Sequence, residues 1–211
     1  MRAVVYVHGR GGSASESGHY KALFPACDVI GLDYKDAAPW EAGREINKAI
    51  KEIKASCDGV ILIANSIGAF FAMNADIEGD VEHAYFISPI VDMEKLIRDM
   101  MAGAGVTETE LRERKIIRTD LGEDLSWEYL RYVREHPARW RAPTDILYGS
   151  GDHLTPADTM TAFAREHHAS LTVMENGEHW FHTDEQMQFL DNWLREKTDS
   201  HALGLDYKKT L

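Results

Sequence analysis

Short apolar runs alternate with helical segments along this chain of 211 residues. The runs are apolar at consecutive positions, which is typical of strands covered on both faces. They fall at residues 3–7, 28–32, 60–64, 84–87, 145–148 and 171–174. Between the second and third runs, one apolar stripe with helical spacing is formed by Ile46, Ala49, Ile50 and Ile53. Because strands separated by helices pair in parallel, the sequence predicts an α/β fold: an open, mainly parallel six-stranded sheet with helices on both faces.

One interval, residues 89–142, interrupts the alternation, because it contains no predicted strand. Its first part predicts a helix whose apolar stripe consists of Met93, Leu96, Ile97, Met100 and Met101. Trp127 and Leu130 indicate a further helix before the next strand. We therefore expect a single domain, residues 1–198, with a small helical cap inserted at about 90–142. A tail without periodicity, residues 199–211, should be loosely held.

The net charge of the chain limits the kinds of molecule that it is expected to bind. The formal net charge of −12 at pH 7 argues against nucleic acid or an anionic membrane as the main partner, since both repel an acidic surface. Basic residues do gather in one stretch, and they predict a solvated helical face. They are Arg112, Arg114, Lys115, Arg118, Arg131, Arg134, Arg139 and Arg141.

Other features of the sequence bear on the compartment. No stretch approaches the roughly 20 apolar residues of a membrane span, and the first residues lack the pattern of a signal peptide. The cysteines, Cys27 and Cys57, are isolated and are expected to be buried free thiols. We expect a cytoplasmic protein, and the sequence leaves open whether it forms a homo-oligomer.

A glycine-rich loop follows the first predicted strand and has two interpretations. Its residues GRGGSA at 9–14 fit the G-x-G-x-x-A pattern of dinucleotide-binding turns, and Asp33 follows about where a ribose-binding carboxylate would lie. That interpretation requires a helix that starts within the glycines and packs on the sheet. Residues 13–18 show no apolar stripe, so we favour a different role for this loop.

Three predicted strands end in turns that carry chemically active side chains. Ser66 lies in ANSIG at 64–68, between a strand and an apolar helix, with a small residue two positions before it and two after it. Asp152 lies in GSGDHLTP at 149–156, and His179 lies in GEH at 177–179. The functional groups of such sheets cluster at the C-terminal ends of the strands, so these three side chains are expected to meet.

These turns resemble those of the α/β-hydrolase superfamily. ANSIG is similar to the nucleophile elbow G-x-S-x-G, with Ala64 in place of the first glycine. GSGDHLTP is similar to the acid turn G-x-x-D-x-x-x-P, and the order Ser, Asp, His is that of the family. The resemblance extends from Ala3 to about Leu194 and implies a sheet that lacks the first two strands of the family.

The resemblance implies a serine hydrolase in which Ser66 is the nucleophile, His179 the general base and Asp152 the residue that orients the base. The backbone N–H groups of Arg10 and Ile67 would then form the oxyanion hole. The implied reaction is cleavage of small carboxylic esters through an acyl-enzyme, and it needs no metal or organic cofactor.

The sequence leaves the substrate open. A thioesterase or amidase would use the same residues, and a ligand-binding protein could share the scaffold. We expect the cap to roof an acyl pocket with Met100 and Met101, because methionine side chains adapt to varied apolar ligands. Trp180 could add an aromatic wall. The alternative is that the methionine stripe packs on the edge of the sheet.

Several residues compete with the predicted triad. Asp92 is a rival acid because it follows the strand that ends at Ile87, and His182 is the nearest rival to the base. His182, like the pair at 167–168, is expected to be exposed. His153 beside Asp152 could suggest a metal pair, but no other spacing supports one.

Overall fold

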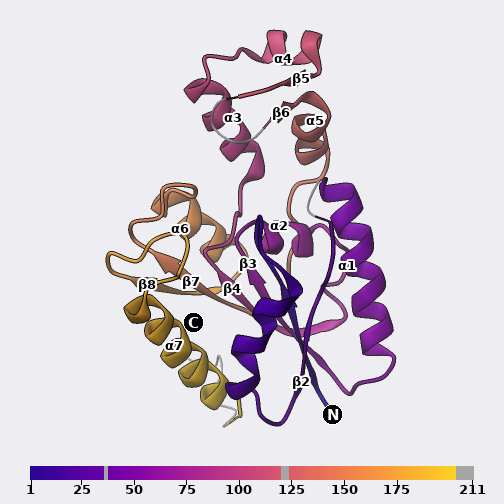
Figure 1. The fold of residues 1–211 in the computed structure, drawn as a ribbon, viewed down its shortest axis with the longest axis vertical. Coiled ribbons are helices and arrows are strands. Elements are labelled where there is room, and N and C mark those ends of the chain that lie inside the picture. The colour runs from indigo at the N-terminus through magenta and orange to yellow at the C-terminus, as the bar shows by residue number, and fades with distance from the viewer. Residues whose placement is uncertain (36–37, 120–123, 203–211) are drawn as a thin grey trace.

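The computed structural model describes residues 1–35, 38–119 and 124–202. Its main sheet has six parallel strands in the order β2-β1-β3-β4-β7-β8 (Figure 1). These strands are β1 (Ala3–Val7), β2 (Asp28–Gly31), β3 (Val60–Asn65), β4 (Val81–Ile87), β7 (Thr144–Gly149) and β8 (Ser170–Met174). The predicted parallel sheet is confirmed, and β4 begins earlier than the sequence indicates.

Helices cover both faces of this sheet, because apolar side chains alternate between the faces along each strand. In β1, Val5 and Val7 join the apolar core beneath α1, α2 and α6, whereas Val4 and Tyr6 join the core beneath η1 and α7. The bounds of these helices are α1 (Pro39–Lys54), α2 (Ile67–Met73), α6 (Ala157–Glu166), α7 (Asp184–Ala202) and the 3-10 helix η1 (Ala14–Ala22).

The two central connections leave the sheet on opposite faces. The loop after β1 leads through η1 to β2, and the loop after β3 leads through α2 to β4. Since β1 and β3 are neighbours in the sheet, their C-terminal ends form the point at which the direction of winding reverses. Open α/β sheets bind their ligands at this point.

The segment between β4 and β7 forms a cap beyond the C-terminal ends of the strands (Figure 1). It contains α3 (Met93–Gly103), α4 (Glu108–Arg114), α5 (Trp127–Glu135) and a short antiparallel pair, β5 (Ile116–Ile117) and β6 (Leu125–Ser126). The prediction of an interval without strands is therefore wrong. A pair of two-residue strands is too short for periodicity to reveal.

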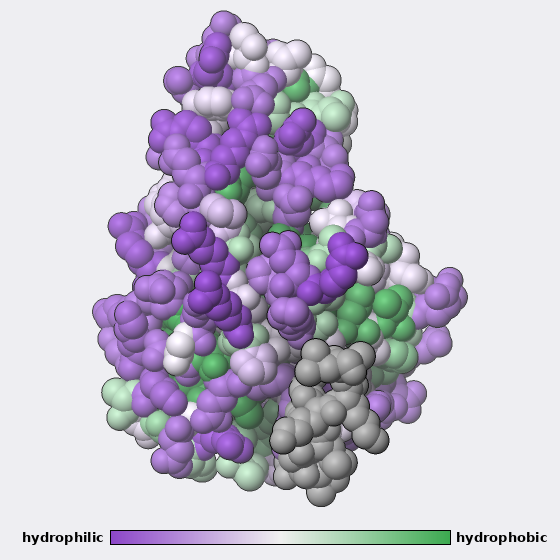
Figure 2. Space-filling view, turned by 180° about the vertical axis from the view of Figure 1, so that it is seen from behind, coloured by the Kyte–Doolittle hydropathy of each residue, from purple (hydrophilic) through white to green (hydrophobic). Residues whose placement is uncertain are grey.

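The outer surface of the cap is mostly hydrophilic when seen from behind (Figure 2). The predicted basic stretch overlaps α4 and α5 of the cap, and acidic residues pair with part of it. Arg134 contacts Glu94 at 2.8 Å and Glu108 at 2.7 Å, and Arg114 contacts Glu110 at 3.1 Å. The other basic residues of this stretch are exposed, as predicted, but among them Arg112 and Arg131 alone lie in helices, so the predicted helical face is confirmed only in part.

Three further expectations can be compared with the structure. The segment after the glycine-rich loop is a 3-10 helix rather than the α-helix of a dinucleotide fold. Helix α7 continues to Ala202, so the predicted tail is helical at 199–202, and residues 203–211 lie outside the described residues. Cys27 and Cys57 are free but only half-buried. None of the described helices is long and apolar enough to cross a membrane.

Candidate active site

Ser66 occupies a strained turn between β3 and α2. Its φ of 53° and ψ of −123° lie outside the regions that side-chain-bearing residues favour, at a cost of about 1–3 kcal/mol. Three backbone hydrogen bonds hold the turn. The Ser66 N–H donates to the Ile87 oxygen at 2.9 Å, and the Ser66 oxygen accepts the N–H groups of Ala69 and Ile90, each at 3.1 Å. A backbone held in this way fixes the direction of the serine hydroxyl.

Small residues on either side allow this turn to form. A Cβ at Gly68 would lie 2.3 Å from the backbone oxygen of His8, so only glycine fits where α2 passes the loop after β1. Ala64, which replaces the family glycine, is fully buried in β3 between Val7 and Phe86 of the neighbouring strands. Its methyl group fits there, so alanine in place of the first glycine of the G-x-S-x-G pattern does not prevent the strained turn at Ser66.

The turns that carry Asp152 and His179 are joined to each other. The Gly151 N–H donates to the Gly177 oxygen at 2.8 Å, and the Asn176 N–H donates to the Ser150 hydroxyl at 2.8 Å. Each turn follows one of the paired strands β7 and β8, so the acid and the histidine face each other from adjacent strand ends.

These elements bring Ser66, His179 and Asp152 into one hydrogen-bonded line. The Ser66 Oγ lies 2.8 Å from His179 Nε2, and His179 Nδ1 lies 2.7 Å from Asp152 Oδ2. A carboxylate only accepts, so Nδ1 donates to Asp152 and the neutral ring offers Nε2 as acceptor for the serine proton. The Asp152 side chain is fully buried and that of His179 is 12% exposed, so solvent competes little for these bonds.

Asp152 is held by further hydrogen bonds. Its Oδ1 accepts the backbone N–H of Leu154 at 2.7 Å and that of Thr155 at 3.2 Å. The Tyr148 hydroxyl donates to the Thr155 oxygen at 2.8 Å and closes the turn. Burial raises the pKa of Tyr148, and the nearby Asp152 charge raises it further. Bonds to Oδ1 leave Oδ2 directed at the histidine.

The glycine-rich loop after β1 lies against the serine. A Cβ built on Gly9 would lie 3.2 Å from Ser66 Cβ, so Arg10 is one residue from this contact. Tyr34 holds this loop in place. Its hydroxyl donates to the His8 backbone oxygen at 2.5 Å, and its ring stacks on the His8 ring with the ring centres 4.4 Å apart. The amides of Arg10 and Ile67 thus belong to backbone segments that adjoin the serine.

Solved structures share this architecture. The chain is similar to Est1E from Butyrivibrio proteoclasticus with ferulic acid bound, with a TM-score of 0.74 and 16% identity over 95% of this chain and 89% of that chain. For alpha/beta hydrolase domain-containing protein 10 from mouse, the TM-score is 0.69 and the identity 14%, over 94% of this chain and 90% of that chain. For the propionate-bound thermophilic esterase Est2 from Thermogutta terrifontis, the TM-score is 0.65 and the identity 15%, over 100% of this chain and 85% of that chain.

The chain has the α/β-hydrolase fold. No protein-family model and no curated protein matches its sequence, so the similarity is carried by the three-dimensional arrangement. In this α/β-hydrolase fold, the predicted elbow, acid turn and histidine turn fall at the ends of β3, β7 and β8.

The residues that compete with the predicted triad make other contacts in the structure. Asp92 is exposed and caps α3, accepting the Lys95 N–H at 2.9 Å. His182 is exposed and bonds to the Trp180 oxygen through Nδ1 at 2.7 Å. His153 and His168 are exposed, but the expected exposure of His167 is wrong: it is half-buried, and its Nδ1 lies 2.8 Å from the Trp140 oxygen.

The predicted substrate-binding residues lie in different environments. Met101 is buried with Met93 and Ile97 in the core of the cap, and Met100 is partly buried beside them. Trp180 is 67% exposed and stacks on His182 at 4.4 Å. Most of the methionine stripe therefore packs inside the cap, and the part played by Met100, Met101 and Trp180 in substrate binding stays a prediction.

A pocket of about 540 Å³, called a hollow below, lies between the cap and helix α6. Its lining includes the apolar residues Phe70, Val91, Met93, Val133 and Phe163. Neither Ser66 nor His179 is among the residues that line it, so its position does not coincide with the candidate triad. Of the methionine stripe, Met93 alone reaches this hollow.

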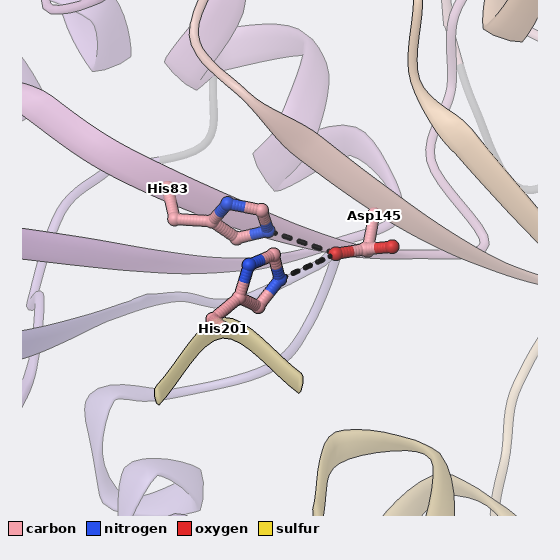
Figure 3. Close-up of side chains that lie close together, drawn as sticks. All are labelled: His83, Asp145 and His201. Carbon is pink, nitrogen blue, oxygen red and sulfur yellow. Dashed lines mark hydrogen bonds and ion pairs between the residues drawn. The ribbon is translucent and has the colours of Figure 1, made fainter. Parts of the chain in front are cut away.

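A second polar cluster, which sequence reasoning missed, lies at the opposite end of the strands. Asp145 on β7 accepts from His83 on β4 and from His201 on α7 (Figure 3). Burial alone would raise the pKa of Asp145, but hydrogen bonds from His83, Lys197, Ser170 and His201 lower it below its usual range. Burial lowers the pKa of His201. The sequence separations of 62 and 56 residues give no local motif.

Proposed function

We propose that this protein is a serine hydrolase that cleaves small carboxylic esters through an acyl-enzyme intermediate. The observation that carries the proposal is the line of two hydrogen bonds from Ser66 through His179 to the buried Asp152. A hydroxyl, an imidazole and a carboxylate in this order are the groups that nucleophilic acyl transfer requires.

The first half of the reaction forms the acyl-enzyme. Ser66 Oγ attacks the ester carbonyl carbon while His179 Nε2 takes the hydroxyl proton, so the carbonyl oxygen becomes an oxyanion. The tetrahedral intermediate then collapses, the bond to the alcohol oxygen breaks, and His179 returns its proton to the leaving alcohol. In the second half, water attacks the acyl group with the same proton transfers and releases the carboxylic acid.

Two features lower the barrier. Asp152 holds the tautomer of His179 and stabilises the imidazolium that forms during attack. The backbone N–H groups of Arg10 and Ile67 are assigned to the oxyanion, and each such donor contributes about 3 kcal/mol. This chemistry uses no metal and no organic cofactor.

The choice of esters rests on the solved structures with the same fold. Est1E is described with ferulic acid bound and Est2 with propionate bound, and both ligands are carboxylic acids, the product class of ester hydrolysis. Thioesters and amides present the same carbonyl to the same nucleophile, so they are the alternative substrates. A protein that binds a ligand without turnover is the alternative of a different class.

The proposal is tested with matched substrates that share one acyl group as ester, thioester and anilide. The wild type should cleave the ester with the highest kcat/KM, and Ser66→Ala should lower that value by about 10⁴-fold or more. Ser88→Ala is the control, since Ser88 also ends a strand with positive φ, at 42°, and its hydroxyl has no hydrogen-bond partner within the described residues.

Two results would redirect the proposal. A higher kcat/KM for the thioester or the anilide would reassign the substrate class while keeping the triad. A wild type that binds acyl compounds but releases no product from any of the three would favour the ligand-binding alternative.

A further inference from the structure

The polar cluster around Asp145 brings two histidines and one carboxylate together from three separate elements. His83 Nε2 lies 2.9 Å from Asp145 Oδ2, and His201 Nε2 lies 3.0 Å from the same oxygen (Figure 3). β4 and β7 are neighbouring strands, and the register places Asp145 opposite Tyr85, two residues after His83. His83 and Asp145 therefore face the same side of the sheet, the side covered by α7.

The three side chains present the donor set of a transition-metal ion. One ligand atom from each residue falls within 4.8 Å of the other two. With metal–ligand bonds of about 2.0–2.2 Å, tetrahedral ligand atoms lie about 3.4 Å apart, so small side-chain shifts would make room for an ion. Imidazole nitrogen combined with a carboxylate suits Zn²⁺, whereas Mg²⁺ and Ca²⁺ prefer sites made entirely of oxygen.

The surroundings of Asp145 fit this use. Lys197 Nζ lies 3.0 Å from Oδ1, the other carboxylate oxygen, and also donates to the Ser170 hydroxyl at 2.9 Å. Lys197 thus fixes the carboxylate and leaves Oδ2 for the ion, as outer hydrogen bonds do around metal-binding carboxylates. The side chain of Asp145 is 3% exposed, and those of His83 and His201 are 13% and 23% exposed, so the carboxylate is buried while the histidines border solvent.

We propose that His83, Asp145 and His201 bind one Zn²⁺ ion, with water completing the coordination, and that the ion ties the last turn of α7 to the N-terminal end of the sheet. This site is separate from Ser66 and takes no part in acyl transfer. Its effect would be on stability, because an ion that binds only the folded chain stabilises it.

The competing explanation is a metal-free cluster. In that case the two imidazole rings donate hydrogen bonds to a buried carboxylate whose charge Lys197 also balances, and they bind no ion. The two explanations differ in one measurable property, which is the affinity of the folded chain for Zn²⁺ and its dependence on both histidines.

The test uses the full chain, treated with a chelator that is then removed. Calorimetric titration with ZnCl2 should give one ion per chain, and Zn²⁺ should raise Tm, whereas MgCl2 at the same concentration should not. His201→Ala and His83→Ala should each weaken Zn²⁺ binding by at least about 100-fold, since losing an outer-shell partner alone costs roughly 10- to 100-fold.

His19→Ala is the matched control, because His19 Nε2 lies 2.7 Å from Asp191 Oδ1, and the other group that contacts this carboxylate is Arg195, at 3.8 Å, which is not a metal ligand. It should leave the affinity unchanged. Circular dichroism of each variant checks that it folds, and X-ray absorption of the zinc complex should report two imidazole ligands. Absence of Zn²⁺ binding to the wild type, or an unchanged affinity in both His201→Ala and His83→Ala, would overturn the proposal.

Discussion

Gly149 lies directly against the carbonyl of Gly177, so close that a Cβ on Gly149 would come within 2.3 Å of that oxygen. This contact joins the end of β7, which leads to Asp152, to the turn that leads to His179. The relative position of the acid and the histidine is therefore set by backbone packing, and the side chains need little adjustment to meet.

We expect Gly149→Ala to push these turns apart and to lower kcat/KM by about 100-fold, since a displacement near 1 Å in a catalytic group has effects of that size. Steady-state ester hydrolysis measures it. Gly79→Ala is the control, because a Cβ at Gly79 would meet open space. If Gly149→Ala kept wild-type kcat/KM, packing of the turns could not be what positions the triad.

The two candidate acids should differ sharply. Asp152→Asn should lower kcat/KM by about 10⁴-fold, because an amide at this position favours the wrong tautomer of the histidine. Asp92→Asn should change activity little, since asparagine caps a helix as well as aspartate does. Parallel kinetics on both variants measure this, and a larger loss in Asp92→Asn would move the acid to the end of β4.

The meeting of Ser66, Asp152 and His179 in one hydrogen-bonded line could be predicted because each of these residues lies in a short local motif. Ser66, Asp152 and His179 each follow a strand whose continuous apolar character is visible in the sequence, and parallel pairing brings the strand ends together. The strained φ of Ser66 and the hydrogen bonds between the two turns could not be predicted in detail, since they depend on atomic packing.

Tyr85 should make the protein sensitive to alkali. Burial raises the pKa of this phenol, and the nearby Asp145 charge raises it further. Because an unfolded tyrosine ionises near pH 10, the unfolded chain loses this proton first as pH rises. The contribution of Tyr85 to the free energy of unfolding is therefore complete below about pH 10. Above that pH it falls by about 1.4 kcal/mol per pH unit.

Tyr85→Phe removes this contribution. Urea unfolding of wild type and Tyr85→Phe between neutral pH and pH 11 should therefore show a stability difference that is constant below pH 10 and then moves in favour of the variant. Two curves that stay parallel over the whole range would mean that Tyr85 ionises equally in the folded and unfolded chains.

Met101 and Trp180 provide a matched test of the predicted substrate pocket. Met101 is 6% exposed, so Met101→Ala should lower the free energy of unfolding by about 2–5 kcal/mol. If the Met101 side chain packs inside the cap alone, this variant should affect acetyl and octanoyl esters equally. Trp180 is 67% exposed, so Trp180→Ala should leave stability unchanged and raise KM only if its ring contacts the substrate. A selective rise in octanoyl KM for Met101→Ala would instead place that side chain in the pocket.

The features that the sequence did not predict leave no readable pattern in it, for different physical reasons. The strands β5 and β6 have two residues each, the 3-10 helix η1 has few apolar positions, and the cluster of His83, Asp145 and His201 joins residues far apart in the chain. Periodicity needs segments longer than two residues and a repeated apolar position, and a cluster assembled by tertiary packing has no fixed spacing in the sequence.

The most direct test of the central claim is intact-protein mass spectrometry after exposure to a fluorophosphonate, which forms a covalent bond with an activated serine. We predict one adduct per wild-type chain, located at Ser66 by peptide mapping, the same adduct on Ser88→Ala, and none on Ser66→Ala. An adduct that persists on Ser66→Ala, or a wild-type chain that takes up no label, would contradict the assignment of Ser66 as the nucleophile.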